Sequence, residues 1–303
     1  MNDIVFTEHD LGCSPIDELF AAGVLLRETY ELLRIAHSRG GYIAGGFAAL
    51  VGYMCVVKRC THAELCSAVA HHLGNGMYMR PESAYNNASH GDIDVWFPDR
   101  VSLDLFTSEV THHYGITFGG NVKVSDTVTG TAIEYRIGDR QRVQVIRNYV
   151  MPMHEQLARF DIFNAMACIN DRTLTVPKGW LELEENRTLH VATWKSPWTV
   201  SRVFKYMRKK GYMRLTPETS AHVVNEALAA CTYVHDRPEL SVASRDITMN
   251  TLRSSCKRKT LPWVLKQLFS SFTDEQLVLL SFLCNDPNGY NSSMHEVIKR
   301  HSE

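Results

Sequence analysis

The stretch that decides the fold is Gly91-Asp92-Ile93-Asp94-Val95-Trp96-Phe97-Pro98. Its two aspartates alternate with apolar residues, so in a β-strand both carboxylates leave one face of the sheet while the apolar side chains enter a core on the other face. Two neighbouring carboxylates repel each other unless a cation or a proton lies between them. The stretch therefore indicates a strand that carries a divalent-metal site, with Asp92 and Asp94 as its ligands.

A second motif lies upstream, where the short apolar segment Tyr42-Ile43-Ala44 runs into Gly45-Gly46 and a series of small residues. This order is typical of a strand, a glycine turn and a helix. Glycine lets the backbone approach a ligand closely, and the free amides at a helix start favour an anion such as phosphate. The alternative is that the glycines serve tight strand-to-helix packing, and the sequence leaves both interpretations open.

The rest of the pattern predicts a mixed α/β unit followed by helices. Helices are expected over residues 15–38, 61–73, 99–117 and 151–158. Residues 132–137 and 142–147 alternate with period two around Gly138-Asp139, which indicates a β-hairpin. From residue 197 onward the chain reads as successive helices, and no strand pattern interrupts them.

We therefore expect an α/β (α+β) protein of two domains. A small mixed-sheet domain with an N-terminal helix should occupy residues 1–180, with an inserted helix and loop at 55–90, and an all-helical domain should occupy 181–303.

Composition gives the chain no global electrostatic partner. Its 303 residues hold 32 Lys and Arg against 33 Asp and Glu, so any surface that binds nucleic acid must be local. Eight cysteines occur without a C-x-x-C pair, which argues against a zinc ribbon and for reduced, largely buried thiols. The acidic N-terminus and the lack of a long apolar run predict a cytoplasmic protein without a membrane partner.

Taken in order, the strand, glycine turn, helix, Asp-x-Asp strand, hairpin and a helix carrying Phe-Asp-x-x-Asn resemble the polymerase-beta-type nucleotidyltransferase superfamily. In particular, they look like the branch that holds the CCA-adding and poly(A) polymerases, with its phage and large-virus members. The motifs that carry the resemblance are Ala44-Gly45-Gly46, Asp92-Ile93-Asp94, Val143-Gln144-Val145-Ile146, Phe160-Asp161-Ile162-Phe163-Asn164-Ala165-Met166-Ala167 and Arg202-Val203-Phe204-Lys205-Tyr206.

The resemblance implies transfer of a nucleotidyl group from a nucleoside triphosphate to an acceptor hydroxyl, with two Mg²⁺ ions at the reacting phosphate. Asp92 and Asp94 would be the bridging metal ligands. Gly45 and Gly46, followed by Phe47 in place of the usual serine or arginine, would hold the β and γ phosphates through the backbone.

A third carboxylate normally completes such a site, and here Gln144 occupies its place. Asp161 is then the candidate, as a metal ligand or as a contact to the nucleotide sugar, although it could equally be a helix N-cap. Glu134 on the neighbouring strand is a weaker substitute. Asn164 follows in the same motif and is expected to contact the nucleotide.

Arg202, Lys205, Tyr206 and Lys209 recur at three- and four-residue spacing on a predicted helix. They could hold the triphosphate and stack on a base, or they could form a solvated basic face. With the basic runs at 208–214 and 257–259, they are the places where a local RNA-facing surface could lie.

RNA, and within RNA the tRNA 3′ end, is the expected acceptor. Two departures, the long interval between the glycines and Asp92 and the three-residue step from Asp161 to Asn164, favour the phage-like branch over CCA addition. The alternatives are transfer to a protein or a small molecule, as in toxin- or resistance-like enzymes, or an inactive fold that serves as a binding or structural module. The sequence gives no oligomeric state and does not say which nucleotide is used.

Overall fold

The computed structural model describes residues 4–74, 91–113, 121–127, 130–138, 141–194, 199, 202, 203, 206, 212 and 214–222. Contacts divide the chain into two units. The first comprises Met1–Phe160 and Asn164–Glu185, and the second comprises Asp161–Phe163 and Asn186–Glu303. The expected boundary between residues 180 and 181 stays a prediction, and the two units are described separately below.

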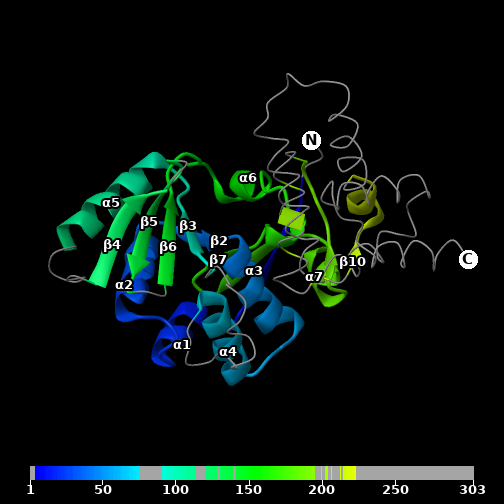
Figure 1. Ribbon diagram of the computed structural model, residues 1–303, viewed down its shortest axis with the longest axis horizontal. Helices are drawn as coiled ribbons and strands as arrows, with labels where there is room; N and C mark the ends of the chain where they lie inside the picture. The colour runs from blue at the N-terminus through cyan, green and yellow to red at the C-terminus, as the bar shows by residue number, and fades with distance from the viewer. Residues whose placement is uncertain are drawn as a thin grey trace, which may run out of the picture. The chain divides into compact units, whose positions relative to one another are not determined.

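A mixed sheet of eight strands, in the order β1-β8-β7-β2-β3-β6-β5-β4, forms the centre of the first unit (Figure 1). The strands are β1 (Phe6–Asp10), β2 (Tyr42–Ala44), β3 (Ile93–Trp96), β4 (Val122–Asp126), β5 (Ala132–Ile137), β6 (Gln141–Ile146), β7 (Cys168–Asn170) and β8 (Thr173–Pro177). β3 and β6 run parallel, whereas the other neighbouring pairs run antiparallel. The expected mixed α/β domain, the Asp-x-Asp strand and the hairpin are therefore confirmed.

The helices of the first unit follow the predicted positions, except α7, which was not predicted. They are α1 (Pro15–Ala21), α2 (Arg27–Ser38), α3 (Gly46–Gly52), α4 (His62–Leu73), α5 (Arg100–His113), α6 (Met153–Leu157) and α7 (Trp180–Glu185), and a π-helical turn at Tyr53–Val57 continues α3. Thr61 caps α4 by accepting from the Glu64 amide, and the Glu64 side chain bonds back to Thr61. The expected helix at 61–73 is thereby confirmed, within the segment interpreted as an insertion.

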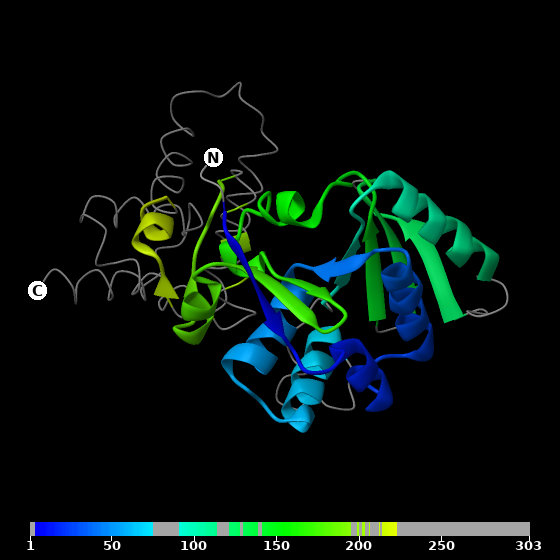
Figure 2. The same cartoon turned by 180° about the vertical axis from the view of Figure 1, so that it is seen from behind.

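One face of the sheet is packed against α2 and α5. Ile93 and Val95 of β3 are buried on this face, and the Phe106 ring of α5 lies 5.1 Å from the Phe97 ring and 6.5 Å from the Tyr135 ring. Figure 2, the view from behind, shows α2 and α5 from this side. Because side chains alternate along a strand, this packing sends Asp94 to the opposite face.

A smaller core lies on the Asp94 face, over β2 and β7. Tyr42, Ala44 and Cys168 pack there with Leu157 of α6, and Phe160 lies against them. Burial raises the pKa of the Cys168 thiol far above its ordinary value, so this cysteine stays protonated and acts as a packing residue. Cys168 thus agrees with the expectation of buried, reduced thiols.

The start of β6 is tied to the connection between α1 and α2 through the buried side chain of Gln141. Its Oε1 accepts from the Leu26 amide at 3.1 Å and from the Thr29 hydroxyl at 2.6 Å, and its Nε2 donates to the Val24 carbonyl at 2.8 Å. Three of the four hydrogen-bonding positions of a fully buried amide are thus directed at residues 24–29.

Two expectations were wrong. The strands β1, β7 and β8 were not foreseen, although they are the three strands of the sheet beyond β2. The Phe-Asp-x-x-Asn motif does not lie on an α-helix, because Ile162 forms an antiparallel bridge with Val191 and only a short 3₁₀ turn, Phe163–Ala165, follows.

The described part of the second unit contains strand structure. β9 (Thr188–Leu189) pairs in parallel with β10 (Arg214–Leu215), which contradicts the expectation that no strand follows residue 197. Strands of two residues are too short to leave a periodic sequence signal. The part of the expected helical series that follows residue 222 lies outside the described residues.

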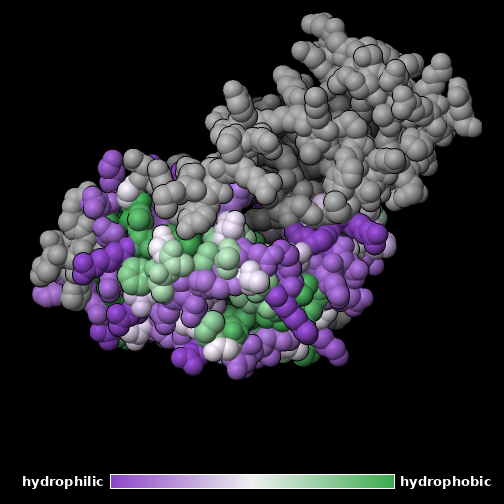
Figure 3. Space-filling view, turned by 90° about the horizontal axis from the view of Figure 1, so that it is seen from below, coloured by the Kyte–Doolittle hydropathy of each residue, from purple (hydrophilic) through white to green (hydrophobic). Residues whose placement is uncertain are grey.

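None of the helices built from the described residues has both the length and the apolar character needed to cross a membrane. The face seen in Figure 3 shows hydrophilic and apolar residues intermixed.

Candidate functional site

The two aspartates lie at the start of the central strand β3. Asp92 directly precedes the strand and Asp94 is its second residue, and both side chains are partly buried. Asp94 pairs with Ala44 of β2 on one side and with Gln144 of β6 on the other. The Oδ1 atom of Asp92 is shielded from solvent. Both carboxylates therefore stand at the middle of the sheet, on the face opposite α2 and α5.

The glycine turn lies directly beside Asp94. Gly45 follows β2 with φ +89° and ψ −147°, a conformation that is almost restricted to glycine. A Cβ atom on Gly45 would lie 3.4 Å from Oδ2 of Asp94 and 3.7 Å from Cε2 of Phe160. The Gly45 amide donates to the Ala167 carbonyl at 3.0 Å, which fixes the turn. The fold thus brings together the two motifs that the sequence singled out.

Gly46 and Phe47 begin α3. The Phe47 side chain is buried, and its ring lies 5.9 Å from that of His72. Any contact of Phe47 with a nucleotide must therefore come from its backbone, while the partly exposed Gly46 has no side chain to obstruct a ligand.

Three polar side chains form a row across neighbouring strands: Asp94 on β3, Gln144 on β6 and Glu134 on β5. The Gln144 Nε2 donates to Oε2 of Glu134 at 3.3 Å, and the Arg136 Nη2 donates to Oε1 of Glu134 at 2.7 Å. The bond from Arg136 is the main reason that the pKa of Glu134 lies below its ordinary value, against the opposing effect of burial. Glu134 is therefore a carboxylate at neutral pH.

The donor set can be compared with the needs of Mg²⁺. Among the described residues, no group of three or more His, Cys, Asp or Glu side chains gathers into a metal site. Mg²⁺ in proteins is commonly bound by one or two carboxylates together with waters and substrate phosphates, so Asp92 and Asp94 suffice as protein ligands. Gln144 adds a neutral carbonyl oxygen, because its amide nitrogen is engaged by Glu134.

Asp161 belongs to the second unit, where its carboxylate is almost fully buried. Its Oδ1 accepts from Nη1 of Arg202 at 2.9 Å and from the Ile162 amide at 3.0 Å, and its Oδ2 accepts from the Thr199 hydroxyl at 3.3 Å. The structure thus pairs two predicted site residues, Asp161 and Arg202, with each other. Their roles in binding metal or nucleotide stay predictions.

Asn164 is fully buried in the first unit. Its side-chain Nδ2 donates to Oε1 of Glu184 at 2.8 Å, and its main-chain carbonyl accepts from the Trp180 indole at 3.1 Å. These bonds hold α7 against the turn that follows Phe163. The structure therefore shows a packing role for Asn164, and its contact with a nucleotide stays a prediction.

The predicted basic helix is described only in part. Tyr206 is buried, with its ring 6.1 Å from that of Tyr212. Lys205 and Lys209 lie outside the described residues. The nucleotide-binding roles of these three residues accordingly remain expectations.

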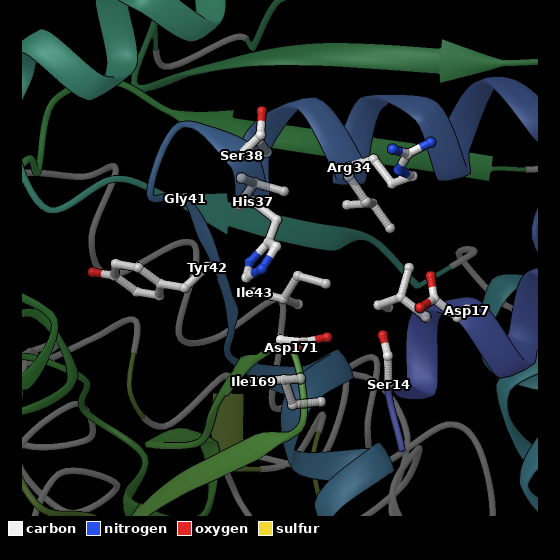
Figure 4. Close-up of a pocket in the computed structure, with 14 residues that line it drawn as sticks. Ser14, Asp17, Arg34, His37, Ser38, Gly41, Tyr42, Ile43, Ile169 and Asp171 are labelled. Atoms are coloured by element: carbon white, nitrogen blue, oxygen red, sulfur yellow. The ribbon is translucent and has the colours of Figure 1, made fainter.

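A cavity of about 230 Å³ opens on the other side of the sheet (Figure 4). Ile43, Val95 and Ile169 form its floor, and His37 and Asp171 are among its polar lining residues. It contains none of the predicted site residues, because the strand alternation that sends Val95 to this side sends Asp94 away from it.

One residue of the candidate site escaped the sequence analysis: Arg136, which holds Glu134. The signal that could have revealed it is the period-two spacing of Glu134 and Arg136, which places the two side chains on the same strand face.

Comparison with known proteins gives distant structural matches. No protein-family model matches the chain, and no curated protein sequence matches it. A CCA-adding enzyme in complex with CTP is 13% identical with a TM-score of 0.46, over 97% of this chain and 70% of that one. The Thermotoga maritima CCA-adding enzyme complexed with tRNA is also 13% identical with a TM-score of 0.46, over 98% and 70% of the two chains.

A tRNA nucleotidyltransferase complexed with a primer tRNA and an ATP analogue is 14% identical with a TM-score of 0.38, over 88% of this chain and 79% of that one. Matches at this level of identity and TM-score do not decide the reaction, which has to be inferred from the residues of the chain itself.

Proposed function

We propose that this protein is a metal-dependent nucleotidyltransferase that moves a nucleotidyl group from a nucleoside triphosphate to an acceptor hydroxyl, with RNA and specifically the tRNA 3′ end as the acceptor. One observation carries the proposal. The Gly45 turn lies against Asp94, so a backbone segment free of side chains adjoins a pair of carboxylates on the same face of the sheet.

Each part of this arrangement suits one requirement of the reaction. A triphosphate carries several negative charges and needs close backbone approach, which the partly exposed Gly46 permits. The Gly45 amide is already bonded to the Ala167 carbonyl, so the expected phosphate contact through that amide is wrong, and Gly45 serves to shape the turn. The carboxylates of Asp92 and Asp94 would hold Mg²⁺, which neutralises charge on the attacking and leaving oxygens when it is bound. The side chains around them, Phe160 and Trp96, have ring centroids 5.6 Å apart and give the site an apolar border.

The choice of RNA as acceptor rests on the motif order in the sequence, which resembles the branch with CCA-adding and poly(A) polymerases. The reaction itself, nucleotidyl transfer, does not depend on that choice.

The test is incorporation of a labelled α-phosphate into RNA. The intact protein is incubated with Mg²⁺, each of the four labelled nucleoside triphosphates, and either total RNA or a tRNA transcript that lacks its 3′-terminal nucleotides. The Asp92→Asn/Asp94→Asn double variant should lose transfer and keep its fold. Asp104→Asn, the same change on the exposed surface of α5, should keep full activity.

A second candidate function is supported by a specific observation: a neutral Gln144 faces Asp94 at the position where a third acid is expected. The protein would then be an inactive nucleotidyltransferase fold that binds nucleotide. Saturable binding of a triphosphate without label transfer to RNA, protein or small molecules would favour this candidate. Equal activity of the double variant and the wild type would exclude Asp92 and Asp94 as metal ligands.

A further inference from the structure

The Asp94 face of the sheet carries a row of cations next to the row of Asp94, Gln144 and Glu134. Arg142 on β6 pairs with Arg136 on β5, and Arg136 pairs with Lys123 on β4. Residues paired across neighbouring strands share a face, so these three side chains leave the sheet on the same side as Glu134. They form one line across three strands, which we call the basic row.

The basic row is costly for the isolated fold. Like charges directly opposite each other in an antiparallel sheet destabilise it, and here two such pairs follow one another. Glu134 offsets part of this repulsion through its bonds to Arg136 at 2.7 and 3.2 Å. Asp92 lies level with Arg142 in the β3–β6 register, and Asp94 lies in the adjacent row. With Mg²⁺ bound at these two aspartates, as the proposed function requires, Glu134 is the carboxylate left against three cations, and the row keeps a local excess of positive charge.

The side chains of the row are accessible to a ligand. The side chain of Arg136 is 50% exposed even with Glu134 bound. Lys123 is exposed and Arg142 is half-buried. α2 and α5, whose apolar residues cover the other face of the same strands, cannot neutralise them.

The position of the row relative to the Gly45 turn indicates what it binds. The strand order is β2-β3-β6-β5-β4, so the glycine turn after β2 and the basic row lie on opposite sides of Asp94. Neighbouring strands are about 4.8 Å apart, so the row extends about 10 Å from β6 to β4, away from the glycines. A triphosphate held at Gly46 would occupy the β2 side and leave the β6 side to the acceptor.

We propose that the basic row binds the phosphodiester backbone of a single-stranded RNA end and guides its terminal hydroxyl toward Asp94. This inference rests on the proposed function and assigns Lys123, Arg136 and Arg142 to the acceptor instead of the triphosphate. A polyanionic strand suits the row because cations on successive strands can each meet a successive phosphate.

The test measures RNA binding without catalysis. A fluorescently labelled tRNA transcript that lacks its 3′-terminal nucleotides is titrated with the intact protein, in the absence of triphosphate, at several salt concentrations. Lys123→Gln and Arg142→Gln are the test variants, because they leave the Arg136–Glu134 pair intact. Arg34→Gln, on the exposed side of α2, is the control for loss of one positive charge.

Each test variant should weaken RNA binding and reduce the slope of log affinity against log salt concentration by about 0.7, the contribution of one contact to a single-stranded phosphate. The Arg34→Gln control should keep the wild-type slope. Affinity for ATP and CTP, measured by calorimetry in the same variants, should not change.

Unchanged RNA affinity in both test variants, or no saturable RNA binding by the wild type, would overturn the proposal. A loss of ATP or CTP affinity with RNA binding retained would also overturn it, because the row would then serve the triphosphate. Thermal melting of each variant shows whether it folds. If Arg142→Gln does not fold, the charge-conserving Arg142→Lys replaces it as the test variant and should bind RNA as the wild type does. Since no transfer is measured, failure here is distinct from failure of the Asp92 and Asp94 variants.

Discussion

Oδ2 of Asp94 lies 3.4 Å from the position that a Cβ atom on Gly45 would occupy. The glycine is therefore required twice, once by its backbone conformation and once by the carboxylate beside it. A side chain here would strain the turn and crowd the Asp94 carboxylate.

Gly45→Ala should lower the free energy of unfolding by about 1–3 kcal/mol, because alanine is strained at this φ and ψ. It should also reduce the rate of nucleotidyl transfer by more than the loss of folded protein explains, since the new methyl group contacts the Asp94 carboxylate. Urea unfolding and labelled α-phosphate incorporation measure the two effects.

Gly23→Ala is the matched control for Gly45→Ala. Gly23 also has a positive φ, +70°, but nothing lies within 4 Å of its Cβ position. It should cost about 1–2 kcal/mol of stability for the left-handed conformation and leave transfer unchanged. Equal activity of the two variants would mean that the approach of Gly45 to Asp94 has no functional role.

Gln144→Glu places three carboxylates in one row with Asp94 and Glu134. Their repulsion should lower the free energy of unfolding by about 1 kcal/mol in the presence of EDTA. Added Mg²⁺ should recover this loss, because a divalent cation relieves the repulsion. The control is Gln144→Met, which removes the amide without adding charge, and its stability should not depend on Mg²⁺. If Mg²⁺ does not change the stability of Gln144→Glu, a cation site at Asp94 is contradicted.

Asp161 and Arg202 should be energetically coupled. Removing Arg202 leaves the buried Asp161 carboxylate without its ion pair, so Arg202→Gln alone should destabilise the protein more than the double variant Arg202→Gln/Asp161→Asn. Because the Arg202 side chain is 46% exposed, the coupling should be about 1–3 kcal/mol, between the values for exposed and buried pairs.

A double-mutant cycle by urea unfolding measures this coupling. The exposed pair Arg100–Asp104 on α5, at 3.0 Å and i,i+4 spacing, is the control and should give about 0.3–0.5 kcal/mol. Additive effects at Asp161 and Arg202 would show that their contact contributes nothing to stability.

His190 should make the stability of the second unit depend on pH. Burial lowers the pKa of its imidazole below 6.5, and Glu218 opposes this only in part. The unfolded chain then binds a proton at a higher pH than the folded chain, so stability falls as the pH drops below about 6.5. His190→Gln should weaken the pH dependence of urea unfolding between about pH 7.5 and 5.5, and an unchanged dependence would refute this.

The control for His190→Gln is His112→Gln, on the exposed surface of α5. It tests whether replacing any histidine by glutamine changes the pH dependence of urea unfolding.

Local signals made the central part of the fold predictable. The alternation of apolar and acidic residues around Asp94 identified β3, the glycine pair identified the turn before α3, and Thr61 with Glu64 identified the start of α4. Each signal lies within a few residues of sequence. The family resemblance of their order, added to these signals, implied that the glycine turn and the Asp-x-Asp strand serve one site.

The three strands beyond β2 could not be predicted in the same way. β1 contains Glu8, His9 and Asp10, which look like a loop until β8 pairs with them. β7 has only three residues, and its place beside β2 depends on a pairing between segments far apart in the chain. Such pairings follow from tertiary packing, which overrides local propensity.

The candidate site shows the same division. The residue types were visible, but the contact of Glu134 with Gln144 and Arg136 depends on cross-strand register. The burial of Asn164 could not be inferred, because its partner Glu184 comes from another element twenty residues later. The structure thus gives Asn164 a packing contact that its motif did not indicate.

The buried amide of Gln141 determines how well the sheet tolerates a change in the length of the connection between β5 and β6. It fixes the first residue of β6 to the loop before α2, independently of the β5–β6 turn. Insertions or deletions in that turn should therefore be absorbed locally and leave Gln144 facing Asp94. If the anchor were lost, a slip of one residue would bring Val143 or Val145 to that position and replace a polar neighbour of the aspartates with an apolar one.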